Sequence, residues 1–375
     1  MKFKNLPLVV GIYVLLSASA FAAEVEISGY ATFIGSYGEN NENVIYFHDV
    51  ANTNNLDFDT GESNVAVQLN AQVTSKVDMT VVLSAQGGKH GAYEINTEWA
   101  YANYQFNEDW GLRIGRIKGP FYMVSDYRDV GYAYPWVRPP LEVYSTNPMS
   151  SLNGVDLVFQ KTVNDINYLF ELYTGSGKHK HGRLLANAYD AGAYSSFSTI
   201  TSKTQLVDFV THGMVGFNAV VGTDAFSLRA GYFDTKVDAF GMTNLVGKFG
   251  GIGLTVDWEN IVIYAEYIDR DTSPQLATAF PDQKAWYTTL GYRMGNFLPY
   301  VTNAELDKGK DTSAYSMVQS SVALGLRYEV DEASAVKFEA MEVEPGLDGV
   351  GRYGLYDSPI TGKGRVYTVS FDVIF

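Results

Sequence analysis

The sequence predicts an all-β fold, a 16-stranded antiparallel transmembrane β-barrel, and three observations lead to this prediction. Most of the chain alternates apolar and polar residues in segments of about ten, which Gly, Asn and Asp separate. Seven short turns alternate with eight longer loops between these segments. The last segment ends on an aromatic residue, Phe375.

The alternation of short turns and longer loops favours a membrane barrel over a soluble β-protein. Outer-membrane barrels have an even number of strands, with short turns at one end and long loops at the other. A soluble sandwich has no reason to separate its connections in this way. Sixteen strands also enclose a lumen too wide for side chains to fill. We therefore expect the polar faces to point into a water-filled lumen and the apolar faces to contact lipid.

The strands are expected in order along the chain, and the range 63–74 shows the pattern clearly. Val65, Val67 and Leu69 share one face there, while Asn64 and Gln68 share the other. The sixteen expected strands are 24–37, 63–74, 78–87, 93–106, 110–117, 151–162, 165–175, 208–222, 225–236, 246–258, 261–271, 283–294, 297–306, 318–330, 333–343 and 362–375. No repeat at a solenoid period and no domain linker is visible, so residues 23–375 are expected to form one barrel domain.

The N-terminal residues 1–22 are expected to be a cleaved signal peptide. Lys2 and Lys4 precede an apolar stretch from Leu6 to Leu16, and Ala20 and Ala22 provide a small-residue cleavage site. The apolar stretch is too short for a membrane anchor. Export is therefore expected, with the mature chain in the outer membrane.

Composition excludes several functional classes. The sequence has no cysteine, which rules out disulfides and thiolate metal sites. It has 27 Lys and Arg against 42 Asp and Glu, and loss of two lysines with the signal peptide leaves 25 against 42, or −17, which disfavours nucleic-acid binding. His179 and His181 form only a weak metal motif, and surface solvation is the favoured interpretation. No G-x-S-x-G motif or phosphate-binding loop is present, so neither an enzyme nor a cofactor is expected.

The range 118–150 interrupts the alternation for 33 residues. An irregular insert of this length is usually functional or disordered, and Phe121, five tyrosines and Trp136 argue against disorder. We expect a packed loop that folds into the barrel and narrows the pore. Together with Arg113 on the preceding strand, the charged side chains expected at the constriction are Asp126, Arg128, Asp129, Arg138 and Glu142, and Lys118 belongs to the same loop.

The last strand carries the sharpest local pattern. Tyr367, Phe371 and Phe375 lie on one face, and Thr368 and Asp372 lie on the other. This strand resembles the terminal strand of Gram-negative outer-membrane porins, whose C-terminal aromatic residue is read by the barrel-assembly machinery. The resemblance makes Phe375 an assembly signal. It also implies contact with outer-membrane lipid and lipopolysaccharide, and a homotrimer.

The stretch GRIKGPFYMVSDYRDVGYAYPWVRPPLEVY looks like the third-loop region of proteobacterial porins. In general porins that loop folds into the barrel, and its acidic residues face basic residues of the wall. Here Arg128 and Arg138 lie among the acidic residues, so the direction of the transverse field stays open. The small residues Gly29, Ala31 and Gly35, with Ala71, are compatible with close packing of subunits.

Strand parity assigns the charged residues of the lumen wall. Arg116 points outward by the same parity, near the rim of the barrel. The expected wall residues are Glu94, Glu98, Arg113, Asp156, Glu171, Arg229, Glu266, Arg293, Arg327, Glu329, Lys337 and Glu339. Rings of such charges tune ion selectivity, and their near balance predicts a weak preference for cations.

The sequence thus predicts a general porin that passes small hydrophilic solutes and ions by diffusion. Two alternatives stay open. One is a channel specific for a sugar or a small anion, in which Tyr127, Tyr132, Tyr134 and Trp136 form a stacking surface. The other is a structural or adhesive barrel that acts through its external loops.

Overall fold

The computed structural model describes residues 24–39, 52, 53, 56, 58, 62–87, 93–183, 206–276, 280–310, 318–345 and 363–375. The predicted signal peptide, residues 1–22, lies outside this part of the chain. None of the helices in the described ranges has the length and apolar character needed to cross a membrane.

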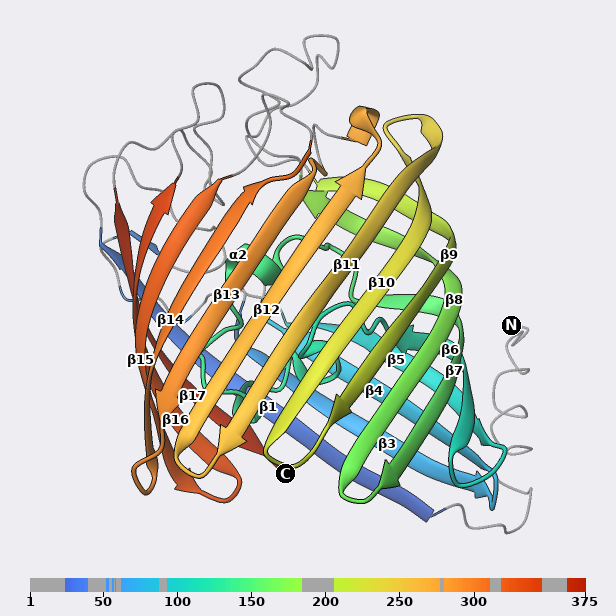
Figure 1. Cartoon of the computed structure of the whole chain (residues 1–375), viewed down its shortest axis with the longest axis horizontal. Helices are drawn as coiled ribbons and strands as arrows, with labels where there is room; N and C mark the ends of the chain where they lie inside the picture. Colours follow the sequence, from blue (N-terminus) through green and yellow to red (C-terminus); the bar gives the residue numbers. More distant parts are fainter. Residues whose placement is uncertain are drawn as a thin grey trace, which may run out of the picture.

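Sixteen long antiparallel strands close into a barrel, as Figure 1 shows. The long strands are β1 (Glu24–Glu39), β3 (Asn64–Thr74), β4 (Val77–Gln86), β5 (Glu94–Gln105), β6 (Trp110–Lys118), β7 (Ser151–Val163), β8 (Ile166–Arg183), β9 (Leu206–Gly222), β10 (Phe226–Ala239), β11 (Met242–Trp258), β12 (Ile261–Thr272), β13 (Gln283–Tyr292), β14 (Phe297–Lys308), β15 (Gln319–Asp331), β16 (Ser334–Pro345) and β17 (Gly364–Ile374). A two-residue strand, β2 (Asn52–Thr53), pairs in parallel with the end of β1. The predicted all-β class and the 16-stranded antiparallel barrel are confirmed.

The barrel closes between its first and last strands. The register of β1 against β17 runs from Tyr30 opposite Ile374 to Glu39 opposite Arg365. Backbone hydrogen bonds between Gly29 and Phe375 extend this ladder at 2.8 and 3.0 Å. Because every long strand in the described ranges has a neighbour on both sides, this part of the chain leaves no long strand edge unpaired.

Two hairpins illustrate how local residues set the turns. Asn164 and Asp165 connect β7 to β8 with φ of 50° and 63°, the pair of positive values that a type I′ turn needs. Phe240 and Gly241 connect β10 to β11 in a similar way, with φ of 55° and 75°. The sequence had predicted a longer loop over 237–245. The ladder instead continues through these residues, so that connection is a tight turn.

The strands next to the range 184–205 are longer than expected. Strand β8 continues to Arg183, whereas the sequence predicts its end at residue 175. Strand β9 begins at Leu206, whereas the sequence predicts its start at residue 208. Register shifts occur in this ladder near Gly177 and between His179 and Gly182. These irregular residues interrupt the alternation, which explains why the sequence pattern ended early.

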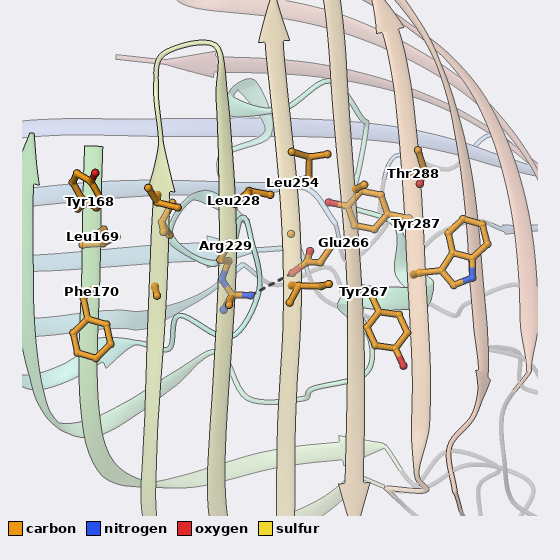
Figure 2. A pocket seen from close by; sticks show the side chains of 18 of the residues that line it. Tyr168, Leu169, Phe170, Leu228, Arg229, Leu254, Glu266, Tyr267, Tyr287 and Thr288 are labelled. Carbon is orange, nitrogen blue, oxygen red and sulfur yellow. Dashed lines mark ion pairs between the residues drawn. The ribbon is translucent and has the colours of Figure 1, made fainter. Parts of the chain in front are cut away.

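The two faces of the wall differ sharply in chemistry. Large apolar side chains are exposed on the outer face, as shown by Ile27 at 65 %, Leu324 at 63 % and Ile252 at 61 %. An apolar groove of about 820 Å³ also lies on this face, across β7 to β13 (Figure 2). The inner face carries most of the polar and charged side chains of the strands. This distribution is the opposite of that in a small soluble barrel.

The main buried cluster lies between the wall and residues 119–150, which we call the central segment. The central segment connects β6 to β7 and contains three single helical turns, η1 (Ser125–Tyr127), η2 (Gly131–Ala133) and α2 (Leu141–Tyr144). Figure 1 shows α2 within the outline of the barrel, and α2 contacts β12, β13 and β14. A short turn η3 (Pro274–Leu276) follows β12.

Candidate functional site

The central segment is fixed to the wall by aromatic side chains. The ring centroid of Phe121 lies 4.8 Å from that of Phe233 in β10. Trp136 packs between Tyr264 and Tyr287, with ring centroids at 4.8 and 5.5 Å. The indole Nε1 of Trp136 also donates a hydrogen bond of 2.7 Å to Thr289 Oγ1. These contacts leave Trp136 only 1 % exposed.

Glu266 is a central anchor for this segment. Its carboxylate accepts hydrogen bonds from the Met123 backbone N–H and from the Tyr144 hydroxyl, both at 2.7 Å. It also forms an ion pair with Arg229 at 3.6 Å, drawn in Figure 2. Gly253 lies between the two charged residues in the register of β10, β11 and β12. A Cβ atom at Gly253 would lie 2.8 Å from the Met123 sulfur, so a larger residue there would require the Met123 side chain to shift.

Four wall cations donate hydrogen bonds to backbone carbonyl oxygens of the central segment. All four are at least nine-tenths buried. The pairs are Arg229 with Pro120, Arg270 with Thr146, Arg327 with Tyr132 and Tyr134, and Lys337 with Gly131 and Trp136. These cations hold the central segment in place rather than facing open water.

Arg270 is the member of this group that the sequence prediction missed. Strand parity places it on the same face as Glu266, which was the available signal. Its guanidinium also donates to the Pro281 carbonyl at 2.9 and 2.6 Å.

Arg138 connects the central segment to Glu62, two residues before β3. Its Nε and one terminal nitrogen donate to the two carboxylate oxygens of Glu62 at 2.6 and 2.8 Å. Glu339 lies 3.7 Å away on the other side. Burial opposes the charged form of Arg138, but Glu62 and Glu339 together favour it, and the net effect raises the pKa of Arg138. Glu62 was not singled out from the sequence, because its partner lies 76 residues away.

The placements of Arg138 and Glu142 differ from the expectation that they face the constriction. Arg138 is 7 % exposed and Glu142 is 1 % exposed. Glu142 accepts a hydrogen bond of 2.6 Å from Gln319, and burial raises the pKa of its carboxyl group despite that bond. Both side chains brace the central segment against the wall. The sequence did not reveal this, because an irregular segment has no strand alternation to distinguish its buried side from its open side.

The remaining expected constriction residues lie on the open side of the central segment. Asp126 is exposed, and Arg128 is partly exposed. The Asp129 side chain is 36 % exposed and pairs with Lys118. Burial opposes ionisation of Asp129, but Lys118 and Arg128 outweigh it and hold the pKa of that carboxyl below its usual range. Lys118 also lies 4.7 Å from the Trp99 ring centroid.

Arg113 faces this open side from β6. One of its nitrogens lies 3.3 Å from Asp156 and 3.2 Å from Glu171, and its side chain stays 33 % exposed. Its guanidinium lies 5.8 Å from the Tyr101 ring centroid. Beside it is a hollow of about 200 Å³ with a mainly polar lining. The lining residues are Asp78, Tyr101, Asn103, Gln105, Glu108, Asp109, Gly111, Arg113, Val158 and Gln160.

The other expected wall residues fall into three groups. Buried members are Asp156, Glu171, Arg229, Glu266, Arg327, Lys337 and Glu339. Partly exposed members are Glu98, Arg293 and Glu329. Glu98 accepts a hydrogen bond of 2.6 Å from Ser84, and Arg293 pairs with Asp257 at 2.8 Å. Glu329 lies 3.6 Å from Arg327. The side chain of Glu94 lies outside the described residues.

The two histidines and Arg116 are placed as follows. His179 stacks on Phe209 at 4.8 Å, and its Nε2 lies 3.2 Å from Thr211 Oγ1. The side chain of His181 lies outside the described residues. Arg116 donates a hydrogen bond of 3.1 Å to the Glu98 carbonyl. Among the side chains that the structure describes, no group of three or more potential ligands gathers around a metal position.

Comparison with solved structures identifies porins and other outer-membrane proteins with this fold. OmpF of Salmonella typhi is 14 % identical over 94 % of this chain and 98 % of its own, with a TM-score of 0.59. An anion-selective porin from Comamonas acidovorans is 11 % identical over 94 % and 100 %, with a TM-score of 0.60. A trimer form of Vibrio cholerae OmpT is 9 % identical over 94 % and 100 %, with a TM-score of 0.57.

No protein-family model and no curated protein sequence matches the chain. At identities of 9 to 14 %, the structural comparisons show the porin fold and nothing finer.

Proposed function

We propose that the chain forms a water-filled channel through the outer membrane of a Gram-negative bacterium, through which small hydrophilic solutes and ions diffuse. The distribution of side chains on the closed barrel carries this proposal. The outer face exposes large apolar groups, and the inner face holds charged groups. Lipid outside and water inside account for both faces.

The central segment narrows this channel in our proposal. Its buried side contacts the wall from β8, where the ring centroids of Phe121 and Tyr173 lie 6.2 Å apart, round to β17 and β1, where Gly131 lies against Asp372 and Thr32. We place the passage between its open side and the remaining wall. Asp126, Arg128 and Asp129 then face Arg113 across the narrow zone. Two of the residues expected there, Arg138 and Glu142, act behind the segment instead.

Conductance across a planar lipid bilayer tests the proposal. Folded protein should give stepwise increases in current, because each inserted barrel adds one open path. Correctly folded protein that inserts without any steps would contradict the proposal and favour a structural or adhesive barrel.

A sugar-specific channel is less well supported. Tyr134 and Trp136 are 5 % and 1 % exposed, so neither ring offers a face to a solute. Arg327 lies 4.7 Å from the Tyr132 ring centroid and covers part of that ring. Tyr127 is partly buried and packs against the main buried cluster. Saturable block of the current by a sugar would revive this alternative.

The selectivity we expect is a weak preference for cations. The residues on the open side carry both signs, and much of the charge of the wall is buried under the central segment. A Debye length of about 8 Å at physiological ionic strength confines each exposed charge to its surroundings. The reversal potential in a salt gradient should therefore shift only slightly toward cations, and more at low salt.

A homotrimer is also part of the proposal, supported by the trimer form of Vibrio cholerae OmpT. Of the small residues expected at a subunit contact, Gly35 is covered by the ring of Phe58, where a Cβ atom would lie 2.5 Å from that ring. Ala31 is 6 % exposed. Native electrophoresis tests the assembly, and a heat-stable species only at the monomer mass would contradict it.

Phe375 is proposed as an assembly signal for the barrel-assembly machinery. It is 64 % exposed on the outer face, and its ring lies over Gly29, where a Cβ atom would be 2.4 Å away. An exposed aromatic ring at the closing strand is available for recognition. Outer-membrane lipid and lipopolysaccharide are the expected partners of the apolar wall.

A further inference from the structure

Three strands meet where the barrel closes, and a buried carboxylate joins them. Asp372 in β17 lies opposite Thr32 in β1, and the Thr32 hydroxyl donates to it at 2.8 Å. Lys337 in β16 places its ammonium 3.2 Å from the same carboxylate. Both charged side chains are 0 % exposed. This arrangement is complete only when the first and last strands have paired.

The central segment lies directly on this group. The Lys337 ammonium donates to the backbone carbonyl oxygens of Gly131 and of Trp136, the latter at 2.7 Å. It also lies 4.7 Å from the Tyr134 ring centroid. An ammonium has three N–H donors, and Asp372 with these two carbonyls provides three acceptors. Two of the three acceptors therefore come from the central segment.

Gly131 shows how closely the segment approaches the closing strands. A Cβ atom there would lie 2.0 Å from Asp372 Oδ1 and 2.4 Å from Thr32 Oγ1. These two oxygen atoms are hydrogen-bonded to each other, so moving them apart would break that bond. The site therefore excludes every residue larger than glycine at this position.

We propose that Lys337 and Asp372 are positioning residues for the constriction, and that the central segment docks only on a barrel whose β1 and β17 have already paired. The proposal rests on the channel function proposed above. Its physical basis is the cost of a buried ammonium without acceptors. An open barrel lacks the Thr32 contact to Asp372. Docking excludes lumen water from Lys337, and two carbonyl oxygens of the segment replace that water as acceptors.

The first test separates closure of the barrel from the position of the segment. Gly131→Ala and Lys337→Met are compared with wild type by heat-dependent electrophoretic mobility, single-channel conductance and the largest polyethylene glycol that enters the pore. Both variants should keep the mobility shift of a closed barrel, while conductance and size limit rise. Lys363→Met is the control, because Lys363 is 56 % exposed and pairs with Glu342 away from the segment.

Closed Gly131→Ala and Lys337→Met barrels with wild-type conductance and size limit would overturn the positioning role. Absence of channels in wild type itself would instead defeat the proposed function. If Lys337→Met does not close, the double variant Lys337→Met with Asp372→Leu should close better, because it removes both buried charges. Failure of the double variant to improve on Lys337→Met would count against the ion pair.

The second test addresses the order of events. The chain has no cysteine, so Val143→Cys introduces a single thiol at a position that is 0 % exposed. During refolding, protection of this thiol from a labelling reagent should appear together with the mobility shift or after it. Full protection before the shift would overturn the proposed order. This readout depends on neither channel activity nor a charged variant.

Discussion

The two sides of the central segment carry similar charged residues in opposite physical states. On its buried side, Arg138 and Glu142 are 7 % and 1 % exposed and are held by fixed partners. On its open side, Asp126 is exposed, and Asp129 is 36 % exposed. On the buried side the charges are held by fixed partners, whereas on the open side they keep contact with solvent.

This difference has a physical origin. A buried charge costs several kcal/mol of solvation unless partners replace the water. Substitution of one residue of a buried ion pair therefore leaves the charge of its partner without compensation. A charge on the open side keeps much of its hydration and can change without that cost. The four predictions below test this contrast, beginning with the largest expected effect.

Glu266→Ala should be the most damaging of these substitutions. It leaves Arg229 buried without its ion-pair partner and removes the acceptor for Met123 and Tyr144. We expect the free energy of unfolding to fall by about 3–5 kcal/mol, measured by urea titration of the folded barrel. Glu329→Ala, at a side chain 45 % exposed, is the matched control and should change little. Equal effects of the two substitutions would remove the contrast.

Arg138→Ala should destabilise the protein less, because the side chain of its main partner, Glu62, is 16 % exposed and keeps some contact with water. We expect a loss of about 2 kcal/mol in the free energy of unfolding, the scale of charged hydrogen bonds. The reversal potential should change little as long as the central segment stays docked. A large change in selectivity with unchanged stability would place Arg138 in the narrow zone after all.

Arg128→Ala should show the reverse pattern. Its side chain is partly exposed and lies near the Tyr144 ring, at 5.9 Å from the ring centroid. We expect a change of less than about 0.5 kcal/mol in stability and a measurable rise in cation preference. The reversal potential in a salt gradient, compared with that of Arg138→Ala, provides the measurement. If Arg128→Ala leaves selectivity unchanged, Arg128 does not line the passage.

The smallest effect concerns pH. Because the folded-state pKa of Asp129 is lowered, its pair with Lys118 stabilises the fold above the usual carboxyl pKa of about 3.9. That contribution is lost as pH falls through the lowered pKa. The stability difference between wild type and Asp129→Asn should thus be present at neutral pH and disappear in acid. A difference that grows below pH ~4 would have the wrong sign.

Much of the architecture follows from the sequence alone. Alternation of apolar and polar residues determined the sixteen strands, and the exposed apolar residues of β1 and β17 lie on the face that alternation predicted. The reason is geometric, since side chains of a strand alternate between two faces. Parity correctly placed Glu266, Arg229 and Lys337 on one face for the same reason. The signal peptide and the channel function stay predictions.

Tertiary structure decided which charges on the inner face meet water. Glu266 and Lys337 share a face with Arg113, yet they are 3 % and 0 % exposed, while the Arg113 side chain is 33 % exposed. Alternation reports only the face of a residue. Burial depends on where the central segment docks, and the contacts that fix it join residues far apart in the sequence, such as Arg138 with Glu62, 76 positions away, and Met123 with Glu266, 143 positions away. No local pattern in the sequence carries that information.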